Sequence, residues 1–331
     1  MSELSYLEKL LDGVEVEWSN LGNLCDIFTG GEAPQKHIKG DTPTSDYQYP
    51  IYGNGAEIYG YADSYRIGQD AVTISSIGAN TGTIYFRKAF FTPIIRLKVV
   101  IPKHSWLLPR YLFHYLSSQT INSKSSSVPN MNASDVKKLS IPIPCPNNPG
   151  KSLAIQSEIV RILDKFTALT AELTAELNMR KKQYNYYRDQ LLSFDNEDVP
   201  HLPMGQKDIG EFIRGGTFQK KDFMDAGVGC IHYGQIYTYY GTYTKKTKTH
   251  ISAALAKKCK KAQKGNLIIA TTSENDEDVC KAVAWLGSDD IAVSSDACIY
   301  KHNLNPKYVS YYFQTEQFQN QKRQYITGAK V

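Results

Sequence analysis

The sequence predicts an α+β protein in which two sheet-rich domains are separated by one long coiled-coil-type helix. Three observations predict this fold. Residues 151–193 contain neither Gly nor Pro, short apolar runs bounded by Gly, Asn and Asp lie on both sides of that stretch, and segments that precede it recur after it. With 331 residues, the chain is long enough for two domains that each bury a core.

The long helix carries a regular apolar stripe. We assign its residues, spaced alternately by four and three, to a seam along which one helix packs lengthwise against another: Ile155, Ile159, Ile162, Phe166, Leu169 and Leu173. After Leu173 the stripe shifts by one position and continues, as at a coiled-coil discontinuity. Such a helix is ~65 Å long at ~1.5 Å per residue. A long core helix of one large domain is the alternative, and the repeat argues against it.

Segments before the helix recur in the same order after it. NLCDIFTGG (residues 23–31) resembles DIGEFIRGG (208–216), GQDAVTISS (68–76) resembles GNLIIATTS (265–273), and PRYLFHYL (109–116) resembles PKYVSYYF (306–313). YLEKLL near the start also resembles YRDQLL at the end of the long helix, so the repeat is circularly permuted. We therefore expect a helix tail at 1–17, a first domain at 18–145, the spacer helix at 146–197 and a second domain at 198–331.

Each domain is expected to be rich in short strands. The proline-rich segment Leu139–Pro149 is expected to form an extended strap into the helix, because its prolines disfavour helix. No counterpart of this strap and helix follows Val331, which suggests a truncated gene or a fragment. The expected strands, bounded by turn residues, are Tyr49–Tyr52, Ala71–Ile77, Gly82–Phe86, Ile94–Ile101, Asn266–Thr271, Val279–Trp285 and Ala297–Lys301.

Composition and motifs exclude several classes of protein. No apolar run is long enough to span a membrane, and the N-terminus lacks the pattern of a secretory signal. The six Cys are scattered without CxxC spacing, which disfavours a zinc site and is typical of a cytoplasmic protein. The chain lacks a GxxxxGK[ST] loop, a GxSxG elbow and an HExxH motif. We expect no catalytic residue, no metal and no bound cofactor in this chain.

The second domain carries the clearest signal for nucleic acid. No carboxylate occurs between Ala226 and Ser273, whereas lysines and tyrosines are frequent there. Lysines neutralise phosphates, and tyrosine, amide and hydroxyl groups bond base edges or phosphates. A solvated lysine-rich face is the alternative. The candidate DNA-binding residues of this domain are Tyr233, Gln235, Tyr237, Tyr239, Lys245, Lys246, Lys248, Thr271, Thr272 and Ser273.

The first domain has a weaker signal, confined to polar loops that suit any surface equally well. Its candidate DNA-binding residues lie after the Gly-Gly pair, in two Gly/Asn turns and in the Ser-rich loop 117–132. They are Lys36, Lys39, Tyr52, Asn54, Asn80, Lys124 and Asn130.

Taken together, these features resemble the specificity subunits of Type I restriction–modification enzymes. The resemblance covers nearly the whole chain and is carried by the permuted repeat, the strap LSIPIPCP, the segment AIQSEIVRILDKF that opens the long helix and LLSFDNE that closes it. It implies two target-recognition domains that each read one half of a split DNA sequence. The helix would set the gap between the half-sites, and the chain would perform no catalysis.

The resemblance also implies partners. They are double-stranded DNA, two modification subunits that methylate adenine, and restriction subunits that act as motor and nuclease. S-adenosylmethionine, ATP and Mg²⁺ are expected on those subunits. Without a second long helix, the chain is expected to self-associate through its own helix or to be a silent partial copy. A stand-alone nuclease or methyltransferase and a protein-binding coiled-coil scaffold are the competing interpretations.

Overall fold

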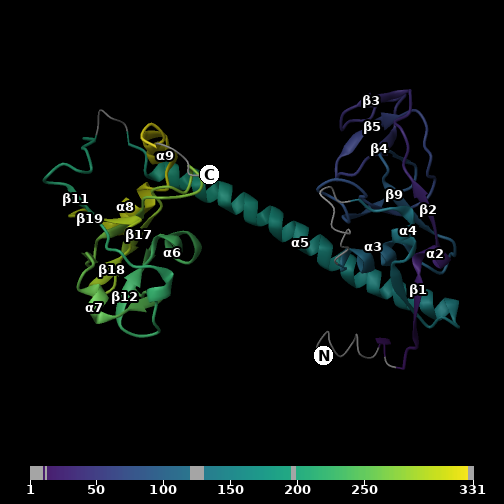
Figure 1. Ribbon diagram of the computed structural model, residues 1–331. Coiled ribbons are helices and arrows are strands. Elements are labelled where there is room, and N and C mark those ends of the chain that lie inside the picture. Colours follow the sequence, from purple (N-terminus) through teal and green to yellow (C-terminus); the bar gives the residue numbers. More distant parts are fainter. Residues whose placement is uncertain (1–9, 12, 120–129, 195–198, 327–331) are drawn as a thin grey trace. The chain divides into compact units, whose positions relative to one another are not determined.

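A computed structural model describes residues 10–11, 13–119, 130–194 and 199–326. The chain divides into two compact units, Met1–Leu173 and Thr174–Val331. One continuous helix, α5 (Pro149–Leu191), contributes its first part to the first unit and its last turns to the second (Figure 1). The expected long helix is therefore confirmed.

Local chemistry explains where α5 begins and why it continues. Pro149 occupies the first turn, where its missing N–H costs nothing. The Asn148 side chain accepts a hydrogen bond from the Lys151 N–H at 3.0 Å and satisfies one of the unpaired amides of that turn. Ala, Leu, Glu and Lys, all strong helix formers, dominate its exposed length.

The first unit is built on two four-stranded sheets. One is antiparallel, in the order β2 (Cys25–Thr29), β9 (Lys98–Pro102), β6 (Ala71–Ile74) and β7 (Ile84–Arg87). The other has the order β3 (His37–Lys39), β5 (Ile58–Ala62), β4 (Tyr49–Tyr52) and β8 (Thr92–Pro93), with β4 and β8 parallel.

Side chains alternate across the first sheet and supply two cores. Val72, Ile74 and Val100 belong to a buried cluster with three short helices, α2 (Leu21–Leu24), α3 (Pro109–Ser117) and α4 (Ala133–Lys137). Val99 and Ile101 face the other way, in a cluster with Ile67 and Phe91. Because β6 is buried on both faces, its sequence AVTI shows no alternation of apolar and charged residues, and Thr73 is its only polar residue.

The strap predicted at Leu139–Pro149 is a strand for part of its length. Strand β10 (Ser140–Pro144) pairs antiparallel with β1 (Val16–Asn20), with Trp18 opposite Pro142. Proline is tolerated here because each strand of a two-stranded ribbon has an unpaired edge. Of the predicted N-terminal helix tail, Leu10 and Leu11 are helical, and residues 1–9 and 12 lie outside the described residues.

The second unit repeats this plan. Its larger sheet has the order β11 (Gly210–Arg214), β19 (Ala297–His302), β16 (Leu267–Ala270), β17 (Ala282–Trp285) and β13 (Tyr243–Thr244). Its smaller sheet has the order β14 (Thr249–Ile251), β12 (Val228–Ile231), β18 (Ile291–Val293) and β15 (Lys261–Ala262). The helices are α6 (Tyr233–Thr238), α7 (Ala253–Ala256), α8 (Pro306–Tyr312) and α9 (Glu316–Arg323), with a 3-10 turn at Lys220–Asp222.

The repeat seen in the sequence is a repeat of topology. Strands β2, β9, β6 and β7 of the first unit correspond in order, direction and pairing to β11, β19, β16 and β17 of the second. The parallel pair of β4 with β8 corresponds to that of β12 with β18. The predicted strands and the two short helices that begin at Pro109 and Pro306 are confirmed, with ends that shift by a few residues.

The start of α5 is fixed to the first unit by polar contacts. Gln156 is fully buried, accepts a hydrogen bond from the Leu108 N–H at 3.0 Å and donates one to the Trp106 carbonyl at 3.0 Å. About two turns further on, Asp164 accepts hydrogen bonds from Arg110 at 2.8 Å and from His114 at 2.6 Å. These contacts hold α3 and α5 together.

These contacts make one part of the predicted seam wrong. Ile155 is buried at 3% exposure, and Ile159 packs against the helix-covered core of the first unit. Both residues therefore serve the first domain and are not open to a second helix. Phe166, Leu169 and Leu173 are 47%, 45% and 57% exposed, and the seam remains a prediction for them and for the half-buried Ile162.

Substitution of Asp164 by Asn is expected to weaken the contact between α3 and α5. Partial burial alone would raise the pKa of Asp164, but the hydrogen bonds from His114 and Arg110 and their charges outweigh it and hold the pKa below its usual value of 3.8. A lowered carboxyl pKa stabilises the fold above the unfolded-state pKa, and the contribution disappears as the pH falls through the folded-state pKa. We expect a loss of about 1 kcal/mol at pH 7, since solvent screens a half-exposed pair.

The loss should shrink to nothing in acid below the folded-state pKa, as measured by denaturant unfolding across a pH series. Asp63→Asn, the same change at an exposed carboxylate, is the control. A destabilisation by Asp164→Asn that does not vary with pH would contradict the assignment.

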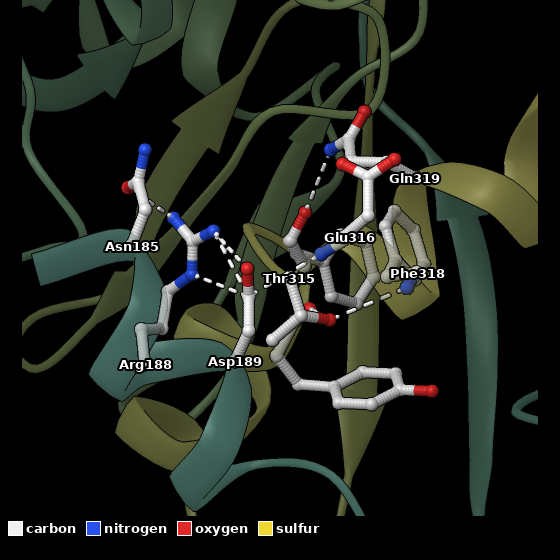
Figure 2. Close-up of polar contacts among 9 residues, drawn as sticks. Asn185, Arg188, Asp189, Thr315, Glu316, Phe318 and Gln319 are labelled. Atoms are coloured by element: carbon white, nitrogen blue, oxygen red, sulfur yellow. Dashed lines mark hydrogen bonds and ion pairs between the residues drawn. The ribbon is translucent and has the colours of Figure 1, made fainter. Parts of the chain in front are cut away.

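The last turns of α5 contact the second unit's own helices (Figure 2). Arg188 donates to Asp189 at 2.9 Å and to Asn185 at 3.1 Å, and Asp189 accepts from the Glu316 N–H at 3.3 Å. Next to this contact, the Thr315 hydroxyl caps α9 by accepting from the Phe318 N–H at 3.2 Å. This end of α5 is therefore attached at the start of α9.

Candidate nucleic-acid interface

The first unit gathers three loops around one asparagine. The Asn54 side chain accepts a hydrogen bond from the Ser76 N–H at 2.7 Å and donates one to the Ile95 carbonyl. The Asn54 carbonyl accepts from the Ser75 hydroxyl at 2.7 Å. These bonds tie together residues 53–56, 75–83 and 94–97, which we call the first loop cluster.

The first loop cluster carries an exposed arginine, Arg96, on a turn with a constrained backbone. Ile95 and Arg96 have φ values of 52° and 58°, in the left-handed region that disfavours side chains. The Ser76 hydroxyl donates to the Arg96 carbonyl at 2.7 Å and helps to hold this turn. Both side chains are exposed. Non-glycine residues held in this region are concentrated at functional sites, and an exposed guanidinium suits phosphate.

The second unit has an equivalent set of loops, residues 232–233, 271–281 and 294–296, which we call the second loop cluster. The Tyr233 N–H donates to the Ser294 hydroxyl at 2.9 Å, and the Thr271 N–H donates to the Asp296 carbonyl at 3.0 Å. The Tyr237 hydroxyl donates to the Thr272 carbonyl at 2.9 Å. Burial raises the pKa of Tyr237 to about 12, so it stays protonated and able to donate.

Backbone bonds show that the two loop clusters are equivalent. The Ile94 N–H donates to the Tyr52 carbonyl at 2.9 Å, and the Ser294 N–H donates to the Ile231 carbonyl at 3.1 Å. The strand pairs that end here, β4 with β8 and β12 with β18, are both parallel. The residues two positions after each of these carbonyls, Asn54 and Tyr233, therefore occupy the same place in the two units, and both were predicted from the sequence.

The Gly-Gly pairs of the repeat lie beside these loops for a steric reason. An added Cβ on Gly30 would lie 2.8 Å from the Ile94 nitrogen, and one on Gly215 would meet the Ser294 carbonyl. The following glycines, Gly31 and Gly216, bridge Ile94 and Ser294. Only glycine allows the strand to pass this close to the turn that carries the loop.

The other predicted residues of the first unit are dispersed. Lys36 and Lys39 are exposed at the edge strand β3, and the Lys39 ammonium lies 5.8 Å from the Tyr59 ring. Asn80 is exposed in the turn between β6 and β7, and Asn130 is exposed where it bridges Ile77. Lys124 lies outside the described residues.

Two predicted residues have structural roles. The Arg87 guanidinium lies 3.8 Å from the centre of the Tyr52 ring, which also contacts Phe91. Gln235 is buried, accepts from the His232 N–H at 3.1 Å and donates to the Thr249 hydroxyl at 3.0 Å. As a direct DNA contact, Gln235 is therefore corrected to a residue that shapes the loops, and the half-buried Tyr52 stays a prediction.

The lysine-rich segment is exposed, but a carboxylate from elsewhere in the chain lies beside it. Lys245, Lys246 and Lys248 are exposed between β13 and β14, and the Lys248 ammonium lies 4.6 Å from the ring of the exposed Tyr239. Further along, Gln263 contacts Asp290 at 3.4 Å. The inference from an acid-free sequence is therefore too simple, because folding returns Asp290 to this segment.

Carboxylates also follow the predicted hydroxyl residues. Thr271 and Thr272 are exposed and Ser273 is half-buried, but residues 274–278 directly after them carry four carboxylates. Phosphate contact through Thr271, Thr272 and Ser273 is disfavoured by this charge. In the second unit the exposed basic surface best suited to phosphate contact is therefore the loop between β13 and β14, which carries Lys245 and Lys246.

Sequence reasoning missed two exposed arginines of the first unit. Arg96 lies in the first loop cluster, and Arg66 lies beside Gly31, at a pocket of about 440 Å³ lined in addition by Phe28, Thr29 and Pro93. Neither belongs to a charge cluster in the sequence. Arg66 precedes the repeated string 68–76, which was its only signal, and Arg96 has none in the sequence.

Other classes of site are not formed. In the described part of the chain, no three His, Cys, Asp or Glu side chains come together to hold a metal ion. Among the helices of the described residues, none has the length and apolar character that crossing a bilayer demands.

Comparison with known proteins identifies the family of this chain. The family model described as "Type I restriction modification DNA specificity domain" matches residues 13–180, half of the chain. The chain belongs to this family. Within it, two curated relatives from Escherichia coli are similar to this chain. The EcoR124I/EcoR124II specificity subunit is 44% identical over 227 residues, or 66% of this chain, and the EcoprrI specificity subunit is 39% identical over 250 residues, or 65%.

The chain spans 54% and 58% of the lengths of these two specificity subunits. Its fold resembles that of a Type-I restriction-modification system S subunit from M. genitalium, with a TM-score of 0.54 and 14% identity over 95% of this chain and 80% of that one. The predicted family and fold class, α+β with two sheet-rich domains and a long helix, are thus confirmed.

Proposed function

We propose that this chain is a non-catalytic DNA-specificity subunit of a Type I restriction–modification complex, in which each domain reads one half of a bipartite DNA site. The observation that carries the proposal is the presence of equivalent loop clusters in two equivalent domains. One contains Asn54 and Arg96, and the other contains Tyr233. Amide, phenol and guanidinium groups suit base edges and phosphates.

The long helix has the function of a spacer in this proposal. Linking two weak DNA contacts makes the second one intramolecular and raises the overall affinity without new contacts. The gap between the half-sites would then depend on the length of α5. Named relatives in the family are specificity subunits of Type I restriction enzymes, which supports this function.

The partners belong to the same proposal. Two modification subunits would bind S-adenosylmethionine and methylate adenine, and restriction subunits would use ATP and Mg²⁺ to move along DNA and cut it. Phe166, Leu169 and Leu173 offer an exposed apolar stripe on α5 for association with another helix, including that of a second copy of this chain.

Reversal of the charges on Lys245 and Lys246 is expected to weaken DNA binding. Each lysine that contacts a phosphate releases counterions, so its loss lowers the slope of log affinity against log salt concentration by about 0.9. Lys245→Glu with Lys246→Glu should therefore lower the affinity at least about tenfold in dilute salt and reduce the slope by up to about two. Fluorescence anisotropy with duplex DNA across a salt series measures both quantities.

Lys165→Glu with Lys207→Glu is the matched control, since it makes the same change in net charge at exposed residues that belong neither to the loop clusters nor to the lysine-rich loop between β13 and β14. The control should bind DNA with nearly the original salt dependence. If both pairs of substitutions weakened DNA binding equally, the effect would come from net charge and not from Lys245 and Lys246. DNA binding that does not vary with salt at all would favour a protein-binding scaffold.

A further inference from the structure

A large pocket with one apolar wall lies within the second unit, where its larger sheet meets α8 and α9. Its volume is about 630 Å³, its apolar wall includes Phe212, Ile269, Val279, Phe313, Phe318 and Tyr325, and polar side chains line the rest. This volume is within the usual range for binding sites. The repeat shows what covers the same surface in the first unit.

Three of the lining residues have counterparts in the first unit. When Gly215 is placed on Gly30, Phe212 of β11 takes the position of Ile27 of β2, because they pair with Tyr300 and Val100 of the equivalent strands β19 and β9. By the same register, Ile269 of β16 takes the position of Ile74 of β6, which shifts the match of GQDAVTISS with GNLIIATTS predicted from the sequence by two residues. The matching strings of α3 and α8 place Phe313 on Leu116.

In the first unit this surface is covered by the segment 130–144. Met131 and Val136 join Ile74 and Leu116 in one buried cluster, against which Ile27 packs. The Met131 N–H donates to the Ser76 carbonyl at 2.8 Å. The segment continues as α4, which Asn132 and Asp135 cap, and then as strand β10.

Within the described residues of the second unit, no second copy of this segment covers the equivalent surface. Thr271 corresponds to Ser76, and no described backbone N–H donates to its carbonyl. Residues 199–203, which precede β11 as β1 precedes β2, have no strand partner and are irregular, with Val199 and Leu202 exposed by 39% and 52%. In the first unit, residues 130–144 supply both the N–H that donates to the Ser76 carbonyl and the strand that pairs with β1.

The turn and the rim that border the pocket are nevertheless formed in the second unit. Cys280 has a φ of 67° at the position of Gly82, whose φ is 89°, and their N–H groups donate to the equivalent carbonyls of Ala270 and Ser75 at 2.9 and 2.8 Å. The buried Lys322 ammonium of α9 donates to the carbonyls of Glu277 and Val279 at 2.7 and 2.6 Å, which fixes the pocket rim. The turn is thus held in the same geometry as in the first unit, and Lys322 fixes the rim beside it.

We propose that this pocket is a docking site for a polypeptide segment with the chemistry of residues 130–144. Such a segment has an apolar side chain after an Asn, a short capped helix with one apolar face, and an apolar strand interrupted by proline. It would fill the pocket with the counterparts of Met131 and Val136, bond the Thr271 carbonyl and pair with residues 199–203. This proposal is independent of DNA reading.

A synthetic peptide of residues 129–144 of this sequence, with a photoreactive methionine analogue at the position of Met131, tests the proposal on the full chain. We expect saturable binding by fluorescence anisotropy and an increase in the thermal unfolding temperature, because a ligand that binds only the folded state stabilises it. After irradiation, mass spectrometry should locate the crosslink on the strand with Ile269 or on the helices with Phe313 and Phe318.

The matched control peptide carries Met131→Asp and Val136→Asp, which place carboxylates in the apolar pocket. It should bind at least about tenfold more weakly. Absence of saturable binding by the original peptide would overturn the proposal, as would equal binding by the two peptides. A crosslink to the first unit, where the peptide would replace residues 130–144 of the chain itself, would also overturn it.

Discussion

Replacement of Gly215 by Ala is expected to destabilise the second unit by about 3 kcal/mol. The new Cβ would meet the Ser294 carbonyl and would lie 2.5 Å from the Val293 oxygen. Both obstacles are backbone atoms, and that backbone is held by hydrogen bonds from Gly215 to Ala297 at 3.0 Å and from Gly216 to Val293 at 2.7 Å. Relief of the clash would break this turn, so the cost lies at the upper end for an overpacked site.

Hydrogen exchange read by mass spectrometry assigns this loss to one unit. Amides of β16 and β19 should exchange faster in Gly215→Ala, while those of the first unit remain protected. Gly241→Ala is the control, since an added Cβ at Gly241 has no neighbour within 4 Å, and it should change stability by less than about 0.5 kcal/mol. Equal stability of Gly215→Ala and Gly241→Ala would contradict the steric explanation of the Gly-Gly repeat.

Replacement of Arg87 by Ala is expected to release the loop that carries Asn54. The Arg87 guanidinium is buried, donates to the carbonyls of Gly55 and Ala56 at 3.0 and 3.2 Å and stacks on Tyr52. Its removal leaves those carbonyls without their donor and opens a cavity. We expect a loss of about 2–3 kcal/mol in stability, measured by urea unfolding of the whole chain.

A functional consequence follows from the position of this loop. In the complex with modification subunits, Arg87→Ala should relax the half-site that the first domain reads and leave the other half-site unchanged. Lys88→Ala provides the control, because its side chain is 83% exposed and its ion pair with Asp70 is solvated. If Arg87→Ala relaxed both half-sites, or Lys88→Ala had an equal effect, the loop would not be the reading element of the first domain.

The elements themselves were predictable from the sequence because their signals are local. Helix α5 follows from a Gly- and Pro-free stretch, and β6 and β16 follow from apolar runs bounded by turns. The repeat also allowed distant segments to be matched, such as the two Gly-Gly pairs. Both pairs are explained by the same feature, a strand backbone that passes very close to a turn.

Roles that depend on tertiary contacts were not predictable. Ile155 and Ile159 belong to the same alternating four-and-three pattern as Phe166 and Leu169, yet the first domain covers only the earlier pair. In the sequence Gln235 resembles a polar recognition residue, but in the structure its amide forms hydrogen bonds within the domain. Arg96 has no sequence signal, because its importance comes from a left-handed turn that pairs with Ser76.

The electrostatic prediction failed for a related reason. An acid-free stretch of sequence says nothing about carboxylates that return from elsewhere, as Asp290 does at Gln263. The acidic residues 274–278 follow the predicted hydroxyls directly and would repel phosphate there. Charge therefore has to be assessed over the folded surface.

The most direct test of the account is a change in the length of α5. The exposed part of this helix contains two adjacent copies of Thr-Ala-Glu-Leu, at residues 170–173 and 174–177, so a third copy should extend it without disturbing either domain. Four residues add ~6 Å at ~1.5 Å per residue, which corresponds to one or two base pairs at about 3.4 Å each.

Methylation mapping of DNA treated with the extended chain and its modification subunits measures the outcome. The account predicts that both half-site sequences stay the same and that the gap between them grows by one or two base pairs. An unchanged gap, or a change in either half-site sequence, would contradict the claim that two DNA-reading domains are separated by a helical spacer.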